Sequence, residues 1–147
     1  MNDEDRQKVL DAKAFAKMAH IDQRRDDGKP YWLHLSDVAE LVSVVAPGDA
    51  NLICAAWLHD TIEDTPLTPS DLVEGFGDDV TRLVMEVTHE GEKDHYGRYF
   101  PRLHSKRGIM LKFADRLSNI ADMESWSKDR QEHYLRKSQF WKDGSDR

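Results

Sequence analysis

Apolar residues recur at helical spacing along most of the chain, and prolines, glycines and polar clusters separate the apolar runs. The first run follows Asn2 and Asp3, either of which can cap a helix, and continues to about His20. Further helical patterns cover residues 33–46, 51–65, 69–76, 78–88, 107–123 and 128–143. No alternating pattern of useful length predicts a β-strand. We therefore expect an all-α fold with about six or seven helices packed at various angles.

The helical pattern at residues 51–65 begins as an apolar run and ends with acidic residues. Its last turns contain four titratable side chains, His59, Asp60, Glu63 and Asp64. Pro66 stops the helix, because the residue before a proline is pushed out of the α region. Carboxylates at a helix C-terminus face the negative end of the helix dipole, which costs roughly 0.3–1 kcal/mol each when exposed and more when water is excluded. The pattern predicts a compensating positive group at this end of the helix.

Two other apolar segments also contain a titratable side chain. His34 lies between Leu33 and Leu35, and Asp115 lies in the apolar pattern at 107–123, with Lys112 nearly one turn before it and Asn119 one turn after it. Two imidazoles and two carboxylates from separate helices can bind one divalent cation. The candidate ligands are His34, His59, Asp60 and Asp115.

Simpler interpretations of the same residues stay open on spacing alone. A single histidine in an apolar segment is more often a hydrogen-bonded core residue than a metal ligand. Asp115 can pair with Arg116 or Lys112, and the acidic cluster after residue 58 can be a solvated helix end. We expect the remaining histidines at the surface or in local hydrogen bonds: His20, His95, His104 and His133.

Composition restricts the possible partners and surroundings. With 147 residues and 39% apolar content, the chain fits one domain over residues 1–147. Its net charge of −7 and the lack of a contiguous basic face argue against a nucleic-acid partner. The single cysteine, Cys54, fits a core position in a reducing compartment. Without a signal-peptide pattern or an apolar run near ~20 residues, we expect a cytoplasmic protein with no membrane partner.

The motifs around these residues resemble a known family. The order His34, then His59 and Asp60, then Asp115 is similar to the His, His-Asp, Asp arrangement of HD-domain metal-dependent phosphohydrolases. AAWLHDTIEDTPLT looks like the AALLHDxxEDT segment of the RelA/SpoT-type alarmone hydrolase domain. RRDDGKPYWLHLSDVAEL resembles that domain's RKxGxPYxxHPxxVAxxL, and LKFADRLSN resembles its KLADRxxN. Spacing and length resemble the small stand-alone, Mesh1-like members.

This resemblance implies a compact HD-domain helical bundle and a specific reaction. The implied reaction is hydrolysis of the 3′-diphosphate of guanosine tetraphosphate or pentaphosphate, ppGpp or pppGpp, to GDP or GTP and pyrophosphate. It implies that the four candidate ligands bind Mn²⁺, although their nitrogen and oxygen atoms also suit Fe²⁺ or Zn²⁺. The implied catalytic pair is Glu63 and Asp64, and the implied substrate contacts are Arg25, Lys112 and Asn119.

The sequence also departs from the family pattern. Leu35 replaces the usual proline after the first ligand histidine, and Asp26 stands where a lysine commonly follows Arg25. An anion beside Arg25 weakens a pocket for a polyphosphate. Two alternatives therefore stay open: an HD phosphohydrolase for another phosphorylated nucleotide, and a metal-stabilised nucleotide-binding module without turnover. The segment 92–107 offers further candidate phosphate contacts, Lys93, Arg98, Arg102, Lys106 and Arg107.

Overall fold

The expected all-α architecture is confirmed. A computed structural model of the protein describes residues 1–88, 103, 105–121, 123 and 126–137, and within these ranges it contains helices and no strand beyond an isolated bridge between Arg24 and Pro30. The helices are α1 (Asp3–Ala19), α2 (Trp32–Val45), α3 (Ala50–Leu58), α4 (Thr61–Asp64), α5 (Pro69–Phe76), α6 (Asp78–Val87), α7 (Lys106–Ala121) and α8 (Lys128–Lys137). None of the helices in the described ranges has the length and apolar character needed to cross a membrane.

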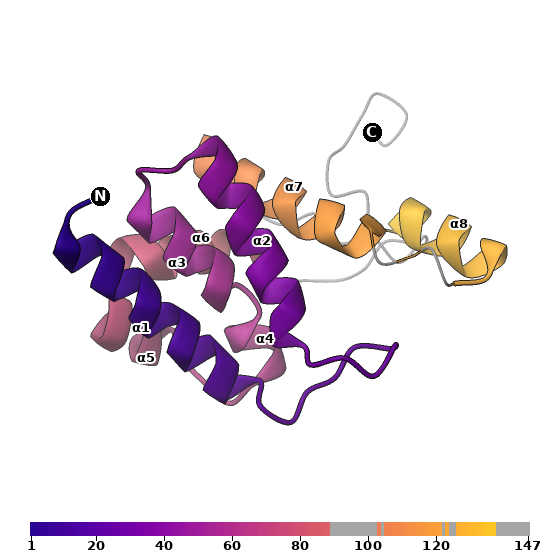
Figure 1. Cartoon of the computed structure of the whole chain (residues 1–147), viewed down its shortest axis with the longest axis horizontal. Helices are drawn as coiled ribbons and strands as arrows, with labels where there is room; N and C mark the ends of the chain where they lie inside the picture. Colours follow the sequence, from indigo (N-terminus) through magenta and orange to yellow (C-terminus); the bar gives the residue numbers. More distant parts are fainter. Residues whose placement is uncertain (89–102, 104, 122, 124–125, 138–147) are drawn as a thin grey trace.

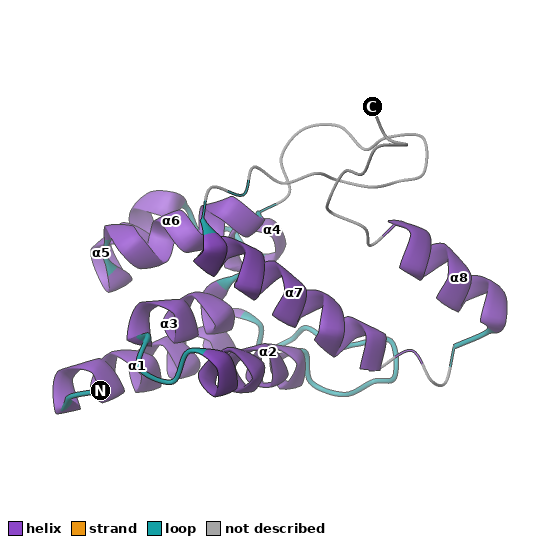
Figure 2. Cartoon of the chain, turned by 90° about the horizontal axis from the view of Figure 1, so that it is seen from above, coloured by secondary structure: helices purple, strands orange, loops and turns teal. Residues whose placement is uncertain are grey.

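Helix α3 forms the centre of the core. It packs against α1, α2, α6 and α7, which surround it in both views (Figure 1, Figure 2). Every residue from Leu52 to Leu58 is buried, as the continuous apolar run predicts, and each large apolar side chain contributes about 1.5–3 kcal/mol by leaving water. Asp49 caps the helix by accepting a hydrogen bond from the Leu52 backbone N–H at 3.1 Å. Burial raises the pKa of the Cys54 thiol to about 11, so this cysteine is an unreactive core residue.

The prediction of one helix over residues 51–65 is wrong, because the chain turns at His59 and Asp60. Helix α3 ends at Leu58 and the short helix α4 begins at Thr61. The Thr61 hydroxyl donates to the Leu58 carbonyl at 2.7 Å, and His59 Nδ1 lies 2.7 Å from the Ala56 carbonyl oxygen. These side chains satisfy carbonyls in the last turn of α3 and so compete with continuation of the helix.

The break changes the surroundings of the acidic residues. Glu63 and Asp64 belong to the single turn of α4 and not to the end of a long helix, so the expected penalty from the α3 dipole does not apply to them. Asp60 precedes Thr61 at the N-cap position of α4, yet its side chain makes no cap hydrogen bond. The Asp60 carboxylate turns instead toward two histidines, as described below.

Other helix boundaries agree closely with the sequence patterns. Thr68 and Asp71 form the capping box that starts α5, with Thr68 Oγ1 accepting from the Asp71 N–H at 3.3 Å and Asp71 Oδ2 accepting from the Thr68 N–H at 2.9 Å. Helix α7 starts one residue earlier than predicted and ends at Ala121. The predicted last helix extends to residue 143, but residues 138–143 lie outside the described part of the chain.

Arg107 fixes the start of α7 against two other helices. Its guanidinium contacts both carboxylate oxygens of Asp49, each at 2.8 Å, and donates to Asp79 Oδ1 at 3.0 Å. These carboxylates stand at the starts of α3 and α6, and they raise the pKa of Arg107 further above its already high ordinary value. Arg107 therefore serves the packing of α7 and is committed to carboxylates, whereas Lys106 beside it is exposed. Lys93, Arg98 and Arg102 lie outside the described residues.

Candidate functional site

Four polar side chains from three parts of the fold converge in the interior. They are His34 from α2, His59 and Asp60 from the turn between α3 and α4, and Asp115 from α7. One nitrogen or oxygen atom from each lies within 4.8 Å of the corresponding atom of every other member. Both histidines and Asp115 are buried, and Asp60 is half-buried. The structure thus brings together all four residues that the sequence proposed as metal ligands.

The distances within this cluster suit a single divalent cation. His59 Nε2 lies 3.1 Å from Asp60 Oδ2 and 3.1 Å from Asp115 Oδ1. His34 Nε2 lies 2.9 Å from Asp115 Oδ1 and 3.8 Å from Asp60 Oδ2. Ligand atoms about 2.0–2.2 Å from a common metal ion, at right or tetrahedral angles, stand roughly 3–3.6 Å apart. The donor set can therefore bind one ion with little rearrangement.

Hydrogen bonds on the far side of each imidazole orient the histidines toward the centre. The Ala56 carbonyl can only accept, so His59 Nδ1 carries a proton and donates to it. His34 Nδ1 lies 2.9 Å from the Ser118 hydroxyl, which can accept in the same way. A neutral His59 then presents the bare lone pair of Nε2 to two carboxylates. These opposed acceptors require a further proton or a cation between them. The hydrogen bond from Nδ1 to a backbone carbonyl is also typical of histidines that bind a metal through Nε2.

The electrostatics of the cluster favour one bound positive charge. Burial lowers the pKa of His59, but the Asp60 and Asp115 carboxylates outweigh burial and raise this pKa well above its ordinary value. Burial raises the pKa of Asp115, but hydrogen bonds from His34 and His59 hold it well below its ordinary value. Without a metal ion, the cluster therefore keeps a proton on His59 at neutral pH. A divalent cation can replace that proton.

Asp115 also pairs with the basic residues that the sequence offered as alternatives to a metal. Its Oδ2 lies 3.4 Å from Arg116 Nη1 and 4.0 Å from Lys112 Nζ, while its Oδ1 faces the two histidines. The two interpretations of Asp115 are therefore compatible, because they use different oxygens. Burial and the neighbouring Arg116 charge lower the pKa of Lys112. The Lys112 side chain is only 4% exposed.

Tyr31 connects the four-residue cluster to an adjoining pocket. Its hydroxyl donates to Asp60 Oδ2 at 2.5 Å, and its ring centroid lies 5.6 Å from that of His34. Burial and the Asp60 charge raise the pKa of Tyr31 far above its ordinary value, so the hydroxyl keeps its proton and remains a donor. In the sequence, Tyr31 stands out only as part of the GKPYW turn. Its position three residues before His34, close to one helical turn, is the sequence feature that could have placed it beside the candidate ligands.

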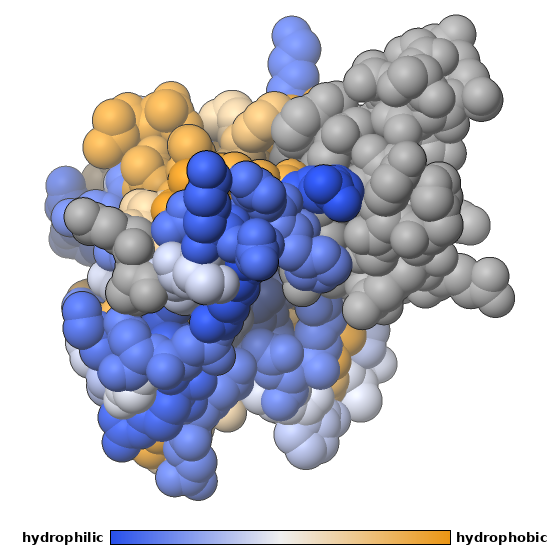
Figure 3. Space-filling model, turned by 90° about the vertical axis from the view of Figure 1, so that its right-hand side faces the viewer, coloured by the Kyte–Doolittle hydropathy of each residue, from blue (hydrophilic) through white to orange (hydrophobic). Residues whose placement is uncertain are grey.

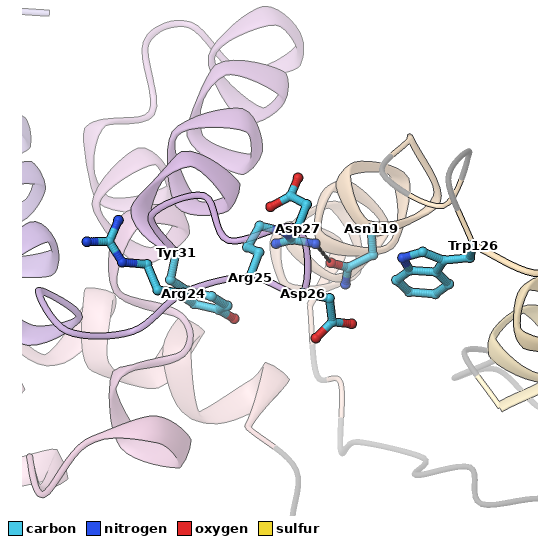
Figure 4. A pocket seen from close by; sticks show the side chains of 7 residues that line it. All are labelled: Arg24, Arg25, Asp26, Asp27, Tyr31, Asn119 and Trp126. Atoms are coloured by element: carbon cyan, nitrogen blue, oxygen red, sulfur yellow. Dashed lines mark hydrogen bonds between the residues drawn. The ribbon is translucent and has the colours of Figure 1, made fainter.

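The pocket beside Tyr31 has a volume of about 210 Å³ and is lined by Arg24, Arg25, Asp26, Asp27, Tyr31, Asn119 and Trp126 (Figure 4). Arg25 Nη2 donates to Asn119 Oδ1 at 3.0 Å, so two of the three expected substrate contacts meet here. Lys112, the third, is not among the lining residues. The loop that carries Arg25 turns at Gly28, whose φ of 84° favours glycine. The end of the molecule that carries α8 has a mainly hydrophilic surface (Figure 3), which suits a polar ligand.

Comparison with known proteins places the chain in a family. A model of the HD domain matches residues 12–97, more than half of the chain. This chain belongs to the HD-domain family. The matched stretch includes His34, His59 and Asp60, and Asp115 follows it in α7.

Several relatives of this HD-domain protein are similar over most of its length. The guanosine-3′,5′-bis(diphosphate) 3′-pyrophosphohydrolase MESH1 of Drosophila melanogaster is 32% identical over 141 residues, covering 87% of this chain and 79% of the relative. The human protein of the same name is 35% identical over 147 residues, covering 86% and 78%. A solved structure of a metazoan orthologue of SpoT that hydrolyses ppGpp has a TM-score of 0.77 and 31% identity, covering 89% of this chain and 81% of that one. The HD-domain protein is therefore of the small MESH1 type.

The expected catalytic pair lies next to the four-residue cluster of the HD domain. Glu63 and Asp64 are exposed on α4, one turn beyond Asp60. Asp64 Oδ2 accepts a hydrogen bond from Gln23 Nε2 at 3.2 Å. Partial burial of its carboxyl group and the Asp60 charge raise the pKa of Asp64 above its ordinary value. A carboxylate with a raised pKa, near but outside the ligand set, is suited to accept a proton.

Asp26 has a compensating cation that the sequence patterns did not indicate. The Arg130 guanidinium on α8 forms an ion pair with Asp26, a residue 104 positions away. Arg130 also stacks on the Trp126 ring, with 3.8 Å between the guanidinium carbon and the ring centroid. The expected weakening of the pocket by an uncompensated Asp26 charge is therefore offset in the folded protein. Two side chains so far apart in sequence cannot be paired from spacing alone.

Loss of a ligand should remove a bound metal. We expect His59→Ala and Asp115→Asn to abolish stoichiometric binding of Mn²⁺, because each removes one of four converging ligand atoms. Elemental analysis after equilibrium dialysis measures this. The exposed residues His133 and Asp78 provide matched controls, and His133→Ala and Asp78→Asn should keep the metal. Full metal content in both ligand variants would contradict the site.

Metal binding near neutral pH should release protons and strengthen as pH rises. The raised pKa of His59 means that its proton stabilises the metal-free fold below about pH 6.5, the ordinary histidine value, and that this stabilisation is lost as pH rises through the folded-state pKa. The metal needs the unprotonated nitrogen and so competes with that proton. Calorimetric titration in two buffers with different ionisation enthalpies measures the release. Heats that are independent of the buffer would contradict the assignment.

Proposed function

We propose that this HD-domain protein hydrolyses the 3′-diphosphate of guanosine tetraphosphate or pentaphosphate, giving pyrophosphate and GDP or GTP. The relatives named MESH1 and the solved SpoT orthologue support this reaction. The observation that carries the proposal is the junction at Asp60. This one carboxylate faces His59 in the candidate metal centre and accepts from Tyr31, which lines the adjoining pocket.

Mn²⁺ is the cofactor that we propose for His34, His59, Asp60 and Asp115, and Fe²⁺ or Zn²⁺ would also suit these nitrogen and oxygen ligands. When bound, such an ion supplies Lewis acidity toward a phosphoryl oxygen and toward water. Neighbouring groups orient the ligands. With an ion bound, the Ser118 hydroxyl and the Ala56 carbonyl would each accept from an Nδ1 proton, so that both Nε2 lone pairs point inward, and Tyr31 holds Asp60 by its hydroxyl.

Asp64 is the group that we propose as general base. Water attacks the phosphorus attached to the 3′ oxygen, and its proton passes to the Asp64 carboxylate. The bond between that phosphorus and the 3′ oxygen breaks, the oxygen takes up a proton, and pyrophosphate leaves. The raised pKa of Asp64 makes its carboxylate a stronger base than an ordinary aspartate. Glu63, adjacent on the same turn, orients the water.

The pocket lined by Arg25 is the proposed site for the nucleoside. Arg25 can stack on the guanine, and Asn119, which already accepts from Arg25, can bond to the sugar. Lys112 stays a predicted substrate contact, and its buried ammonium group lies 4.0 Å from Asp115 Oδ2. The Asp27 carboxylate in the same lining favours the second candidate function, hydrolysis of another phosphorylated nucleotide whose base tolerates an acidic neighbour.

Product analysis and two substitutions test this function. Metal-loaded protein should convert guanosine tetraphosphate to GDP and pyrophosphate in equal amounts. Asp64→Asn and Glu63→Gln should lower kcat by about 10²-fold or more while the metal content stays unchanged, because a general base and its partner are lost. Glu74→Gln, at an exposed acid on α5, is the matched control and should keep the wild-type kcat. Release of orthophosphate, or wild-type kcat in both variants, would overturn the assignment.

The pocket is tested by a separate substitution. Arg25→Ala should raise KM for guanosine tetraphosphate roughly tenfold, about 1.4 kcal/mol, with little change in kcat, because Arg25 lies at the base pocket and away from the reacting phosphorus. Arg136→Ala, at an exposed arginine on α8, is the control. An unchanged KM for Arg25→Ala in an enzyme that hydrolyses the compound well would mean that the base binds elsewhere.

A further inference from the structure

A buried histidine outside the metal centre is connected to Asp64 by one glutamine side chain. His20, at the end of α1, is 2% exposed, and its Nδ1 lies 2.7 Å from Gln23 Oε1. The Gln23 amide nitrogen then donates to Asp64 Oδ2 at 3.2 Å. The sequence predicted His20 at the surface or in a local hydrogen bond. The bond to Gln23 is local, but the side chain is buried.

The chemistry of Asp64 determines which group donates and which accepts in both hydrogen bonds between His20, Gln23 and Asp64. An ionised carboxylate only accepts, so Gln23 must present its amide NH₂ to Asp64 and its carbonyl oxygen to His20. That oxygen also only accepts, so His20 Nδ1 must carry the proton between them. The order of donors and acceptors is therefore unique: His20 donates to Gln23, and Gln23 donates to Asp64.

The rest of the His20 ring shows that this arrangement has a cost. With the proton on Nδ1, Nε2 is a bare acceptor, and within the described residues it is buried without a hydrogen-bond partner. A buried polar atom without a partner destabilises a fold. The ring is held there by Tyr31, whose centroid lies 5.2 Å away and whose hydroxyl donates to Asp60. Stability alone does not explain a histidine at this position.

The backbone keeps Gln23 in a defined place. Its N–H donates to the His20 carbonyl at 3.0 Å, and its own carbonyl accepts from the Tyr31 N–H at 2.9 Å. The same short loop therefore holds Asp64 through Gln23 and Asp60 through Tyr31. These two carboxylates come from one turn of the chain, and the loop sets their relative orientation.

We propose that His20 and Gln23 are positioning residues for Asp64: they occupy its Oδ2 and leave Oδ1 directed to receive the proton of the attacking water. This inference rests on the proposed function, because it assigns a role in the same reaction. Neither His20 nor Gln23 lines the pocket beside Arg25. They act through Asp64, so their loss should lower kcat and leave KM nearly unchanged.

The test is a double-mutant cycle with kcat, KM and metal content measured for each variant. Gln23→Leu should lower kcat roughly tenfold, because a misaligned base is less effective, and should keep its KM and its metal. In an Asp64→Asn background, Gln23→Leu should cause no further loss, because the group that it positions is already removed. If Gln23 only stabilised the fold, Gln23→Leu would lower kcat by the same factor in both backgrounds. Gln7→Leu, at an exposed glutamine of α1, is the matched control and should keep wild-type kinetics.

Substitutions and spectroscopy at His20 provide an independent check. His20→Leu should lower kcat like Gln23→Leu, whereas His20→Asn should recover most of it, because an asparagine amide can donate from nearly the place of Nδ1. Long-range ¹H–¹⁵N spectra of the metal-loaded wild type should show His20 with its proton on Nδ1. This spectrum requires neither turnover nor a folded His20→Leu variant.

Three outcomes would overturn the positioning roles: equal losses from Gln23→Leu in both backgrounds, an effect confined to KM or thermal stability, or a His20 proton on Nε2. Failure of the proposed function is distinct, since it would appear as a wild-type protein that releases no pyrophosphate from guanosine tetraphosphate. In that case the positioning roles fall with it.

Discussion

The site depends on one constraint: two imidazole lone pairs and two carboxylates face one another in the interior of the protein. The Ala56 carbonyl accepts a hydrogen bond from the Nδ1 proton of His59, so this ring cannot relieve the conflict by changing its tautomer. Only a positive charge at the centre resolves it, as a proton on His59 or as a divalent cation. Helices α2 and α7 and the turn after α3 each contribute a side chain to this centre.

Well-packed helices and a few side-chain contacts hold the residues of that centre in place. The buried helix α3 ends where His59 and Asp60 begin, so a well-packed element positions both. Arg107 fixes the first turn of α7, the helix that carries Asp115 two turns later. Tyr31 connects the centre to the pocket, and the ion pair of Asp26 with Arg130 brings α8 to the same pocket. The chemistry is thus distributed over segments that are distant in sequence but close together in the folded protein.

The sequence was sufficient to predict most of the helices and the four converging residues, but not the contacts among them. Apolar periodicity located most of the helices, because each buries one face, and the interrupting polar residues marked the centre. The turn after Leu58 escaped prediction because apolar residues continue to Ile62, while the break depends on the side chains of His59 and Thr61 bonding to backbone carbonyls. The partner of Asp26 and the burial of His20 depend on tertiary packing, which periodicity does not report.

The central claim is that one divalent ion satisfies the four opposed side chains. Its most direct test is a crystal structure of the protein grown with Mn²⁺, with diffraction data collected above and below the manganese absorption edge. The account predicts one strong anomalous peak about 2.0–2.3 Å from nitrogen atoms of His34 and His59 and from oxygen atoms of Asp60 and Asp115. An anomalous map without a peak among these four side chains, at saturating Mn²⁺, would contradict it.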